Sequence, residues 1–190
     1  MEEFIIICGP GRSGTSLTAN VISELGFNFG DLKIRKKDHN KDQTYPGSYE
    51  DMSLGRAIQL WGYALYPKDN WNNPYLIPKE NKKRGPWYFH PIRTLIMSLG
   101  DSILNRALKK NKDKKTLVMK RPSAIWWIWR ISKLSSKHNY PKPKLIFCRR
   151  EEFNAIDGIF GTQGANPLFG ERYLKLINKM IEFYKMSKRG

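Results

Sequence analysis

A chain of 190 residues, of which 40% are hydrophobic and 13% aromatic, is long and apolar enough to form one domain with a sizeable core. This composition excludes an intrinsically disordered polymer. The net charge of +17 predicts an anionic partner, such as a nucleotide, an acidic polymer, nucleic acid or an anionic surface. A solvated basic surface without a specific partner is the alternative.

The two cysteines and the hydropathy of the chain indicate the cellular compartment. Cys8 and Cys148 each end an apolar run, and nothing in their number or spacing resembles a disulfide framework. We expect both to be small core residues in a reducing compartment. The sequence shows no signal peptide, and no apolar stretch approaches the ~20 residues that span a bilayer. These features predict a cytoplasmic protein without a membrane span.

The first predicted elements are a strand at 4–8, a glycine-rich turn and a helix that stops near Gly26. The apolar residues of this helix share one face: Leu17, Val21, Ile22 and Leu25. Strand, glycine turn and helix are an arrangement that holds a phosphate, because backbone N–H groups surround the anion and the positive end of the helix dipole points at it.

The turn has the spacing of the nucleotide P-loop, G-x-x-x-x-G-K-[ST], with Gly9 and Gly14 as its glycines. Thr15 occupies the lysine position, and the only cation of the loop is Arg12. An ATP-using enzyme needs that lysine on the transferred phosphate and the following hydroxyl on magnesium. Ser16 keeps the hydroxyl but the lysine is missing, which favours an anion whose transfer needs no metal.

The middle of the chain alternates loops with helices. The predicted segments are a short strand at 27–29, a flexible polar loop at 31–48, a helix at 50–63, a flexible irregular loop at 66–86 and an amphipathic helix at 91–110. Ser48 is the expected cap of the helix at 50–63.

The last third of the sequence predicts two strand–helix units and a final helix. The segments are strands at 116–119 and 145–148 and helices at 123–136, 152–160 and 171–185. We expect Trp126, Trp127 and Trp129 to be core residues rather than a base-stacking platform. Strands that alternate with helices predict a single α/β domain over 1–190, with a three-layer, mostly parallel sheet and helices on both faces.

Basic residues follow each of the expected parallel strands: Arg12, the pair Lys120-Arg121 and the pair Arg149-Arg150. Ligands of such sheets bind beyond the carboxyl ends of the strands, so we expect these residues to line one crevice. Exposed surface charge is the alternative for each.

The loop resembles the R-S-G-T-[ST] loop of sulfotransferases that use 3′-phosphoadenosine 5′-phosphosulfate (PAPS). The resemblance implies a P-loop NTPase-like sulfotransferase fold, in which Arg12 stabilises the bridging oxygen as the sulfuryl group is transferred. It also implies a set of residues around the 5′-phosphosulfate: Gly11, Arg12, Ser13, Gly14, Thr15 and Ser16.

Three further segments are similar to motifs of this family, and the match covers residues 4–160. Residues 46–51 resemble a G-x-x-E segment, which makes Glu50 the general base. Residues 119–123 resemble a K-D-P-[RF] segment, which places Lys120 near the transferred group. Arg149 lies where the family arginine binds the 3′-phosphate.

The sequence also departs from the family pattern. Asp157 stands where the family has a serine on the 3′-phosphate, and a carboxylate there would repel the phosphate. Either the alignment is shifted here or the contact with the 3′-phosphate has changed. A degenerate, inactive sulfotransferase is therefore a further alternative. Arg121 replaces the acidic residue of K-D-P.

The resemblance implies transfer of a sulfuryl group from PAPS to a hydroxyl or amine, catalysed by Arg12, Glu50 and Lys120 without a metal. The basic segments at 31–41 and 79–84 would suit an acidic glycan as the acceptor, and a small molecule is the alternative. His39, His90 and His138 are rivals of Glu50 as the base. The alternatives are a P-loop kinase for a nucleotide or small molecule and a non-catalytic binder of nucleic acid or an acidic polymer.

Overall fold

The computed structural model describes residues 1–10, 13–30, 32–34, 49–65, 90–149 and 167–187. Its strands are β1 Glu3–Cys8, β2 Leu32–Ile34, β3 Tyr49–Asp51, β4 Thr116–Lys120 and β5 Pro143–Phe147. Its helices are α1 Thr15–Glu24, α2 Met52–Leu65, α3 His90–Lys110, the 3-10 helix η1 Pro122–Trp127, α4 Ile128–Lys137 and α6 Pro167–Ser187.

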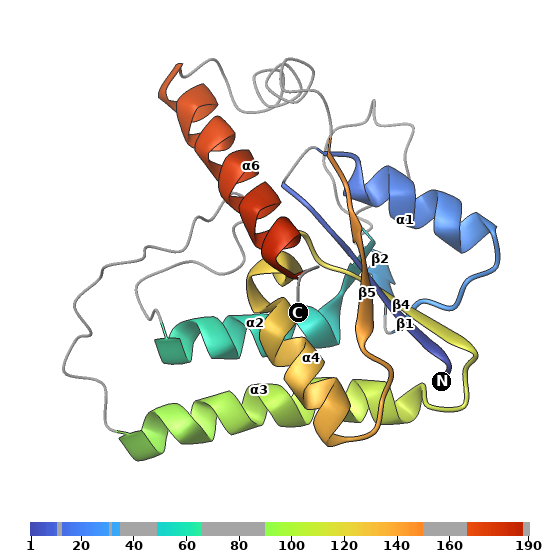
Figure 1. Ribbon diagram of the computed structural model, residues 1–190. Coiled ribbons are helices and arrows are strands. Elements are labelled where there is room, and N and C mark those ends of the chain that lie inside the picture. The colour runs from blue at the N-terminus through green and yellow to red at the C-terminus, as the bar shows by residue number, and fades with distance from the viewer. Residues whose placement is uncertain (11–12, 31, 35–48, 66–89, 150–166, 188–190) are drawn as a thin grey trace.

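A parallel sheet with the strand order β4-β1-β5 forms the middle layer (Figure 1). β2 and β3 form a separate antiparallel pair. Because the three strands of the larger sheet are parallel, their carboxyl ends meet at one edge, as expected from the sequence. This edge contains the turn after β1, Lys120 at the end of β4 and Cys148 just after β5.

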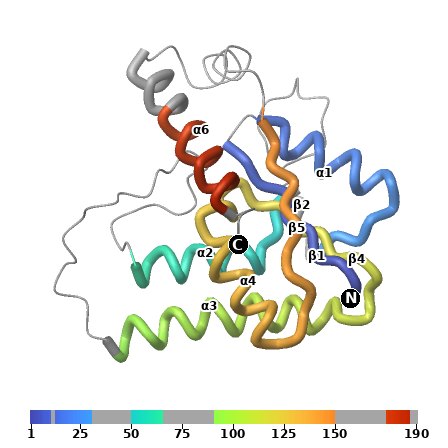
Figure 2. Tube along the Cα trace, viewed as in Figure 1, coloured from blue at the N-terminus to red at the C-terminus, as the bar shows by residue number. Residues whose placement is uncertain are grey.

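Helices cover both faces of the parallel sheet. On one face, α1 packs through Ala19 against Ile7, Val118 and Cys148. The other face carries the larger core, in which α2, η1, α4 and α6 pack on the sheet, and α3 lies against α2. Figure 2 shows α1 and the group of α2, α4 and α6 on opposite sides of the strands. The predicted three-layer α/β fold is therefore confirmed.

The orientation of α1 differs from the hydrophobic pattern. Leu17, Val21 and Leu25 are 52%, 51% and 70% exposed, whereas Thr15 and Ala19 are buried. Small side chains four residues apart let the helix backbone approach β1 closely, which a row of leucines would prevent. Of the four residues that the sequence indicated for the core, only Ile22 packs against it, partly buried beside Ala19, and the other three face solvent.

The end of α1 is as predicted. Gly26 has a φ of +79°, in the left-handed region, and its N–H donates to the carbonyl of Ser23 at 2.9 Å. The strand expected at 27–29 is confirmed only as a bridge, in which Phe29 pairs with Val118 of β4.

Two predictions for residues 31–65 are wrong. Leu32–Ile34 form β2, so this part of the expected 31–48 loop is a strand, and 35–48 lie outside the described residues. Glu50 belongs to β3 rather than to a helix, and α2 begins at Met52. The buried Asp51 carboxylate accepts the N–H of Leu54 at 2.7 Å, which caps the helix two residues after the expected start. Ser48 and the loop at 66–86 lie outside the described residues.

The helix expected at 123–136 is divided into η1 and α4. Trp126 and Trp127 are buried core residues, as predicted, but Trp129 is 52% exposed. Trp129 lies in the first turn of α4, where the backbone changes from 3-10 to α geometry and the side-chain period changes with it. The helices expected at 91–110 and 171–185 are confirmed as α3 and α6, and the one at 152–160 lies outside the described residues.

An ion pair and the contacts around it connect α2, α3 and α4. Arg130 of α4 donates two hydrogen bonds to Asp101 of α3, at 2.9 and 2.8 Å, and lies over the ring of Trp61 of α2. The Trp61 indole N–H donates to the same carboxylate at 3.0 Å. None of the described helices is long and apolar enough to cross a membrane.

Candidate functional site

The turn after β1 requires glycine at its first position. Gly9 has a φ of +148°, and a Cβ at this residue would lie 2.4 Å from the carbonyl oxygen of Cys148. The backbone that leaves β1 therefore runs directly against the backbone that leaves β5. Gly14, with a φ of +88°, turns the chain into α1, and a Cβ there would meet no atom within 4 Å.

The N-terminus of α1 provides donors for an anion. Thr18 is the first residue of the helix whose N–H donates to an i−4 carbonyl, that of Gly14. The N–H groups of residues 15–17 precede it and have no such carbonyl within the helix. The first turn has no acidic residue, so the positive end of the dipole is not neutralised there.

Ser13 adds a hydroxyl to this turn. It is 5% exposed, and its Oγ has no hydrogen-bond partner among the described residues. A buried hydroxyl without a partner is costly, and an anion held by the turn would satisfy it. The described part of the loop therefore fits a phosphate or phosphosulfate. Gly11 and Arg12 lie outside the described residues.

Lys120 brings an ammonium group to the start of α1. It ends β4, its side chain is 2% exposed, and its Nζ donates to Ser16 Oγ at 3.3 Å. Burial lowers the pKa of Lys120, Glu50 opposes this effect, and Arg121 adds to it. A lysine so placed brings a positive charge to the turn between β1 and α1.

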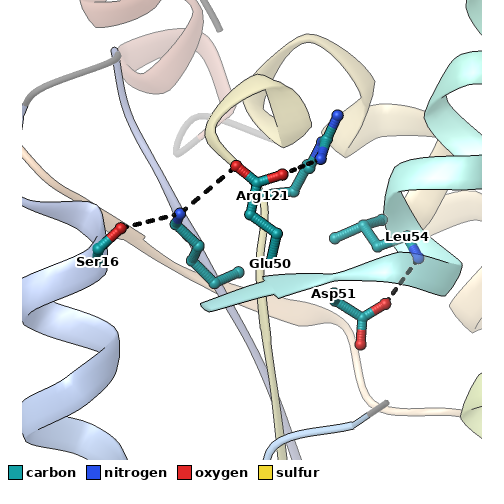
Figure 3. Close-up of polar contacts among 6 residues, drawn as sticks. Ser16, Glu50, Asp51, Leu54 and Arg121 are labelled. Carbon is teal, nitrogen blue, oxygen red and sulfur yellow. Dashed lines mark hydrogen bonds and ion pairs between the residues drawn. The ribbon is translucent and has the colours of Figure 1, made fainter. Parts of the chain in front are cut away.

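Glu50 lies between two cations. One carboxylate oxygen, Oε1, is 3.8 Å from Lys120 Nζ, and the other, Oε2, accepts a hydrogen bond from the guanidinium of Arg121. Figure 3 shows the Glu50 side chain between the side chains of Arg121 and Ser16. The 26% exposure of its side chain leaves the carboxylate reachable from solvent. β3 and β4 thus bring together Glu50 and Lys120, which are 70 residues apart in the sequence.

The end of β5 contributes the third part of this edge. Cys148 donates its backbone N–H to Cys8 at 2.9 Å and its thiol to Thr18 Oγ1 at 3.3 Å. Burial raises the pKa of the Cys148 thiol, while the Thr18 contact and Lys120 lower it. Both cysteines are buried and free, as expected for packing residues. Arg149 follows at the surface, and Asp157 lies outside the described residues.

From its place in the sequence, Arg121 was expected among the basic residues at the strand ends, and its ion pair with Glu50 was not predicted. Its guanidinium lies against Gly55 of α2, where a Cβ would be 3.3 Å from one of its nitrogens. The signal was present, because an arginine that replaces an acidic residue beside an expected carboxylate favours an ion pair. Among the described residues, no three His, Cys, Asp or Glu side chains are grouped so that they could hold a metal ion.

The fold and this edge define an α/β protein with a P-loop-like strand, glycine turn and helix. No family model and no curated protein sequence matches the chain. Among solved structures, the chain is similar to deoxyadenosine kinase from M. mycoides with bound dATP, at 12% sequence identity and a TM-score of 0.41. The similarity covers 98% of this chain and 86% of that chain.

Proposed function

We propose that this protein is an enzyme that transfers the sulfuryl group of PAPS to a hydroxyl or amine of an acceptor. The observation that carries the proposal is the contact between Lys120 Nζ and Ser16 Oγ. In magnesium-dependent P-loop enzymes, the hydroxyl at the Ser16 position binds the metal ion. Here a buried ammonium lies against that hydroxyl and provides a positive charge at the same place.

The described residues support specific roles in this reaction. The N–H groups of residues 14–16, with the hydroxyls of Ser13 and Ser16, bind the 5′-phosphate, and Lys120 stabilises the negative charge that develops on the transferred group. Glu50 takes the proton of the acceptor, a contribution that is typically worth about 10²–10⁴-fold in rate. By resemblance, Gly11 and Arg12 complete the loop, and Arg149 and Asp157 lie near the 3′-phosphate.

A P-loop kinase for a nucleotide or small molecule is the second candidate. The observation that favours it is again Lys120, because an ammonium from β4 could act on the transferred phosphate in place of the lysine that Thr15 replaces. Under this alternative the loop binds ATP with magnesium, and Glu50 takes the proton from the same kind of acceptor. The two candidates therefore differ in the donor nucleotide.

Thermal unfolding with each nucleotide separates the candidates. The product nucleotide 3′-phosphoadenosine 5′-phosphate (PAP) at 100 times its Kd is expected to add about 2.7 kcal/mol to the free energy of unfolding. Lys120→Met should lose most of this stabilisation, and Arg130→Met, whose ion pair lies among the helices, should keep it. Stabilisation by ATP with magnesium and none by PAP would replace the sulfotransferase proposal with the kinase.

Transfer itself is tested with sulfur-labelled PAPS and a panel of acidic glycans, alcohols and amines. Wild-type protein should label an acceptor, and Glu50→Gln should reduce kcat by about 10²-fold or more while it leaves the Kd for PAP nearly unchanged. If Glu50→Gln transfers the label within a few fold of the wild-type rate, Glu50 is not the base.

A further inference from the structure

We propose that Arg121 is a positioning residue for the transfer reaction: it binds one oxygen of Glu50 and thereby presents the other oxygen to the acceptor. This inference rests on the proposed function. It concerns a residue at which the chain departs from the K-D-P pattern, since Arg121 stands where that pattern has an acidic side chain.

The two oxygens of Glu50 are not equivalent. Oε2 accepts the hydrogen bond of the Arg121 guanidinium, whereas Oε1 faces Lys120 Nζ at 3.8 Å. Since Lys120 in turn donates to Ser16, Oε1 is the oxygen on the side of the phosphate-binding turn. A carboxylate that bound Arg121 through both oxygens could not present one of them to an acceptor near the turn.

The position of Arg121 is itself determined by packing. Its side chain is 11% exposed, and the guanidinium lies against the Gly55 backbone of α2. Its backbone N–H donates to the carbonyl of Ile7 of β1 at 3.0 Å, which holds the residue at the sheet edge. A partly buried charge loses much of its hydration, and the Glu50 carboxylate compensates part of this loss for the guanidinium. The arginine end of this ion pair is therefore held by packing and by the sheet edge, and Glu50 is carried by the backbone of β3.

The proposed proton transfer balances. The acceptor hydroxyl gives its proton to Glu50 Oε1 as its oxygen forms a bond to sulfur. The bond between sulfur and the bridging oxygen of PAPS breaks, and its electron pair stays on the 5′-phosphate of PAP. Arg121 does not touch the reacting atoms. It acts through Glu50, because rotation of the carboxylate away from Oε1 would lengthen the path of the proton.

The pKa of Lys120 tests this arrangement independently of enzyme activity. Glu50 raises the pKa of Lys120, and Arg121 lowers it. Glu50→Gln should therefore move the pH midpoint of Lys120 modification downward, and Arg121→Met should move it upward. The midpoint is measured by competitive amine labelling and mass spectrometry of the peptide that contains Lys120. Shifts in the same direction, or none for Arg121→Met, would overturn the proposal.

The kinetic test compares Arg121→Met and Arg121→Lys with Arg130→Met, which also removes an arginine–carboxylate pair that is partly exposed. Arg121→Met should lower kcat by about tenfold or more, with KM for PAPS and Kd for PAP within about twofold of wild type. Arg121→Lys should recover part of kcat, and Arg130→Met should lose stability only. If Arg121→Met unfolds more easily but keeps kcat, its role is structural and the inference is wrong.

The two tests keep the inference separate from the proposed function. If wild-type protein neither binds PAP nor transfers from PAPS, the sulfotransferase proposal fails by itself. Opposite shifts of the Lys120 midpoint would then still support the Arg121–Glu50–Lys120 arrangement, and parallel shifts would refute it.

Discussion

Replacement of Gly9 by alanine tests whether the turn after β1 presses against the end of β5. The substitution has two costs in the structure. A φ of +148° is unfavourable for any residue with a Cβ, and that Cβ would lie 2.4 Å from the Cys148 carbonyl oxygen and 2.9 Å from Ser13 Oγ. The serine hydroxyl can rotate away, but the carbonyl belongs to the backbone and can move only if β5 moves with it.

Two other glycines separate these costs. Gly14 and Gly26 also have positive φ values, of +88° and +79°, but a Cβ at either meets nothing within 4 Å. Alanine at these positions should cost about 1–2 kcal/mol for the left-handed backbone alone. At Gly9 the displacement of packed backbone should add about 1–3 kcal/mol to a similar strain. The free energy of unfolding should therefore fall about twice as far for Gly9→Ala as for Gly26→Ala.

Urea unfolding followed by tryptophan fluorescence measures all three variants, and PAP titration measures the turn. Under the proposed function, Gly26→Ala should bind PAP as tightly as the wild-type protein, because Gly26 lies beyond the far end of α1. Gly9→Ala should bind it at least tenfold more weakly, since 1.4 kcal/mol of turn distortion has that effect on a Kd. Equal destabilisation by Gly9→Ala and Gly26→Ala would show that the contact between the turn and β5 is not the one described.

Two further predictions concern Lys120 and the contact of α1 with the sheet. Burial lowers the pKa of Lys120 from its ordinary value of 10.5, so the unfolded chain keeps this proton to a higher pH than the folded chain. The charged amine therefore opposes folding fully below the folded-state pKa, and the opposition disappears as the pH rises toward 10.5. The stability gained by Lys120→Met over wild type in urea unfolding should shrink over that window, and a constant difference would contradict the burial cost. Ala19→Leu should cost about 1–3 kcal/mol and weaken PAP binding, because a larger side chain pushes α1 off the sheet. Val21→Ala on the exposed face should stay within about 0.5 kcal/mol of wild type, and a larger loss there would contradict the described orientation of the helix.

The layers of the fold could be predicted from the sequence because the spacing of apolar residues and the alternation of strands with helices are local patterns. The segments 116–119, 91–110 and 171–185 were located in this way, and each became a strand or helix with nearly the expected bounds. The short pair of β2 and β3 could not be found. A strand of three residues is too short for a period, and its partner Glu50 carries a charge that reads equally well as the start of a helix.

The candidate site was only partly visible in the sequence. Parallel strands made the meeting of Ser16 and Lys120 at one edge predictable, since it follows from topology alone. The pairing of Glu50 with Arg121 was less predictable: an arginine in place of an acidic residue favours an ion pair, but this contact depends on how β3 packs beside β4 and on the room that Gly55 leaves. Such contacts are set by packing between elements, which a single sequence does not encode as a local pattern.

The rotation of α1 connects the wrongly assigned face of the helix to the chemistry of the site. Side chains of an α-helix advance by about 100° per residue. If Leu17, Val21 and Leu25 faced the sheet, the Ser16 side chain would point about 140° away from it. With Thr15 and Ala19 inward, Ser16 lies about 80° from the direction of the sheet, on the flank of the helix, where Lys120 reaches it. The same rotation that exposes Leu17, Val21 and Leu25 therefore places the Ser16 hydroxyl beside Lys120, and the hydrophobic pattern fails where the small side chains of Thr15 and Ala19 pack against the sheet.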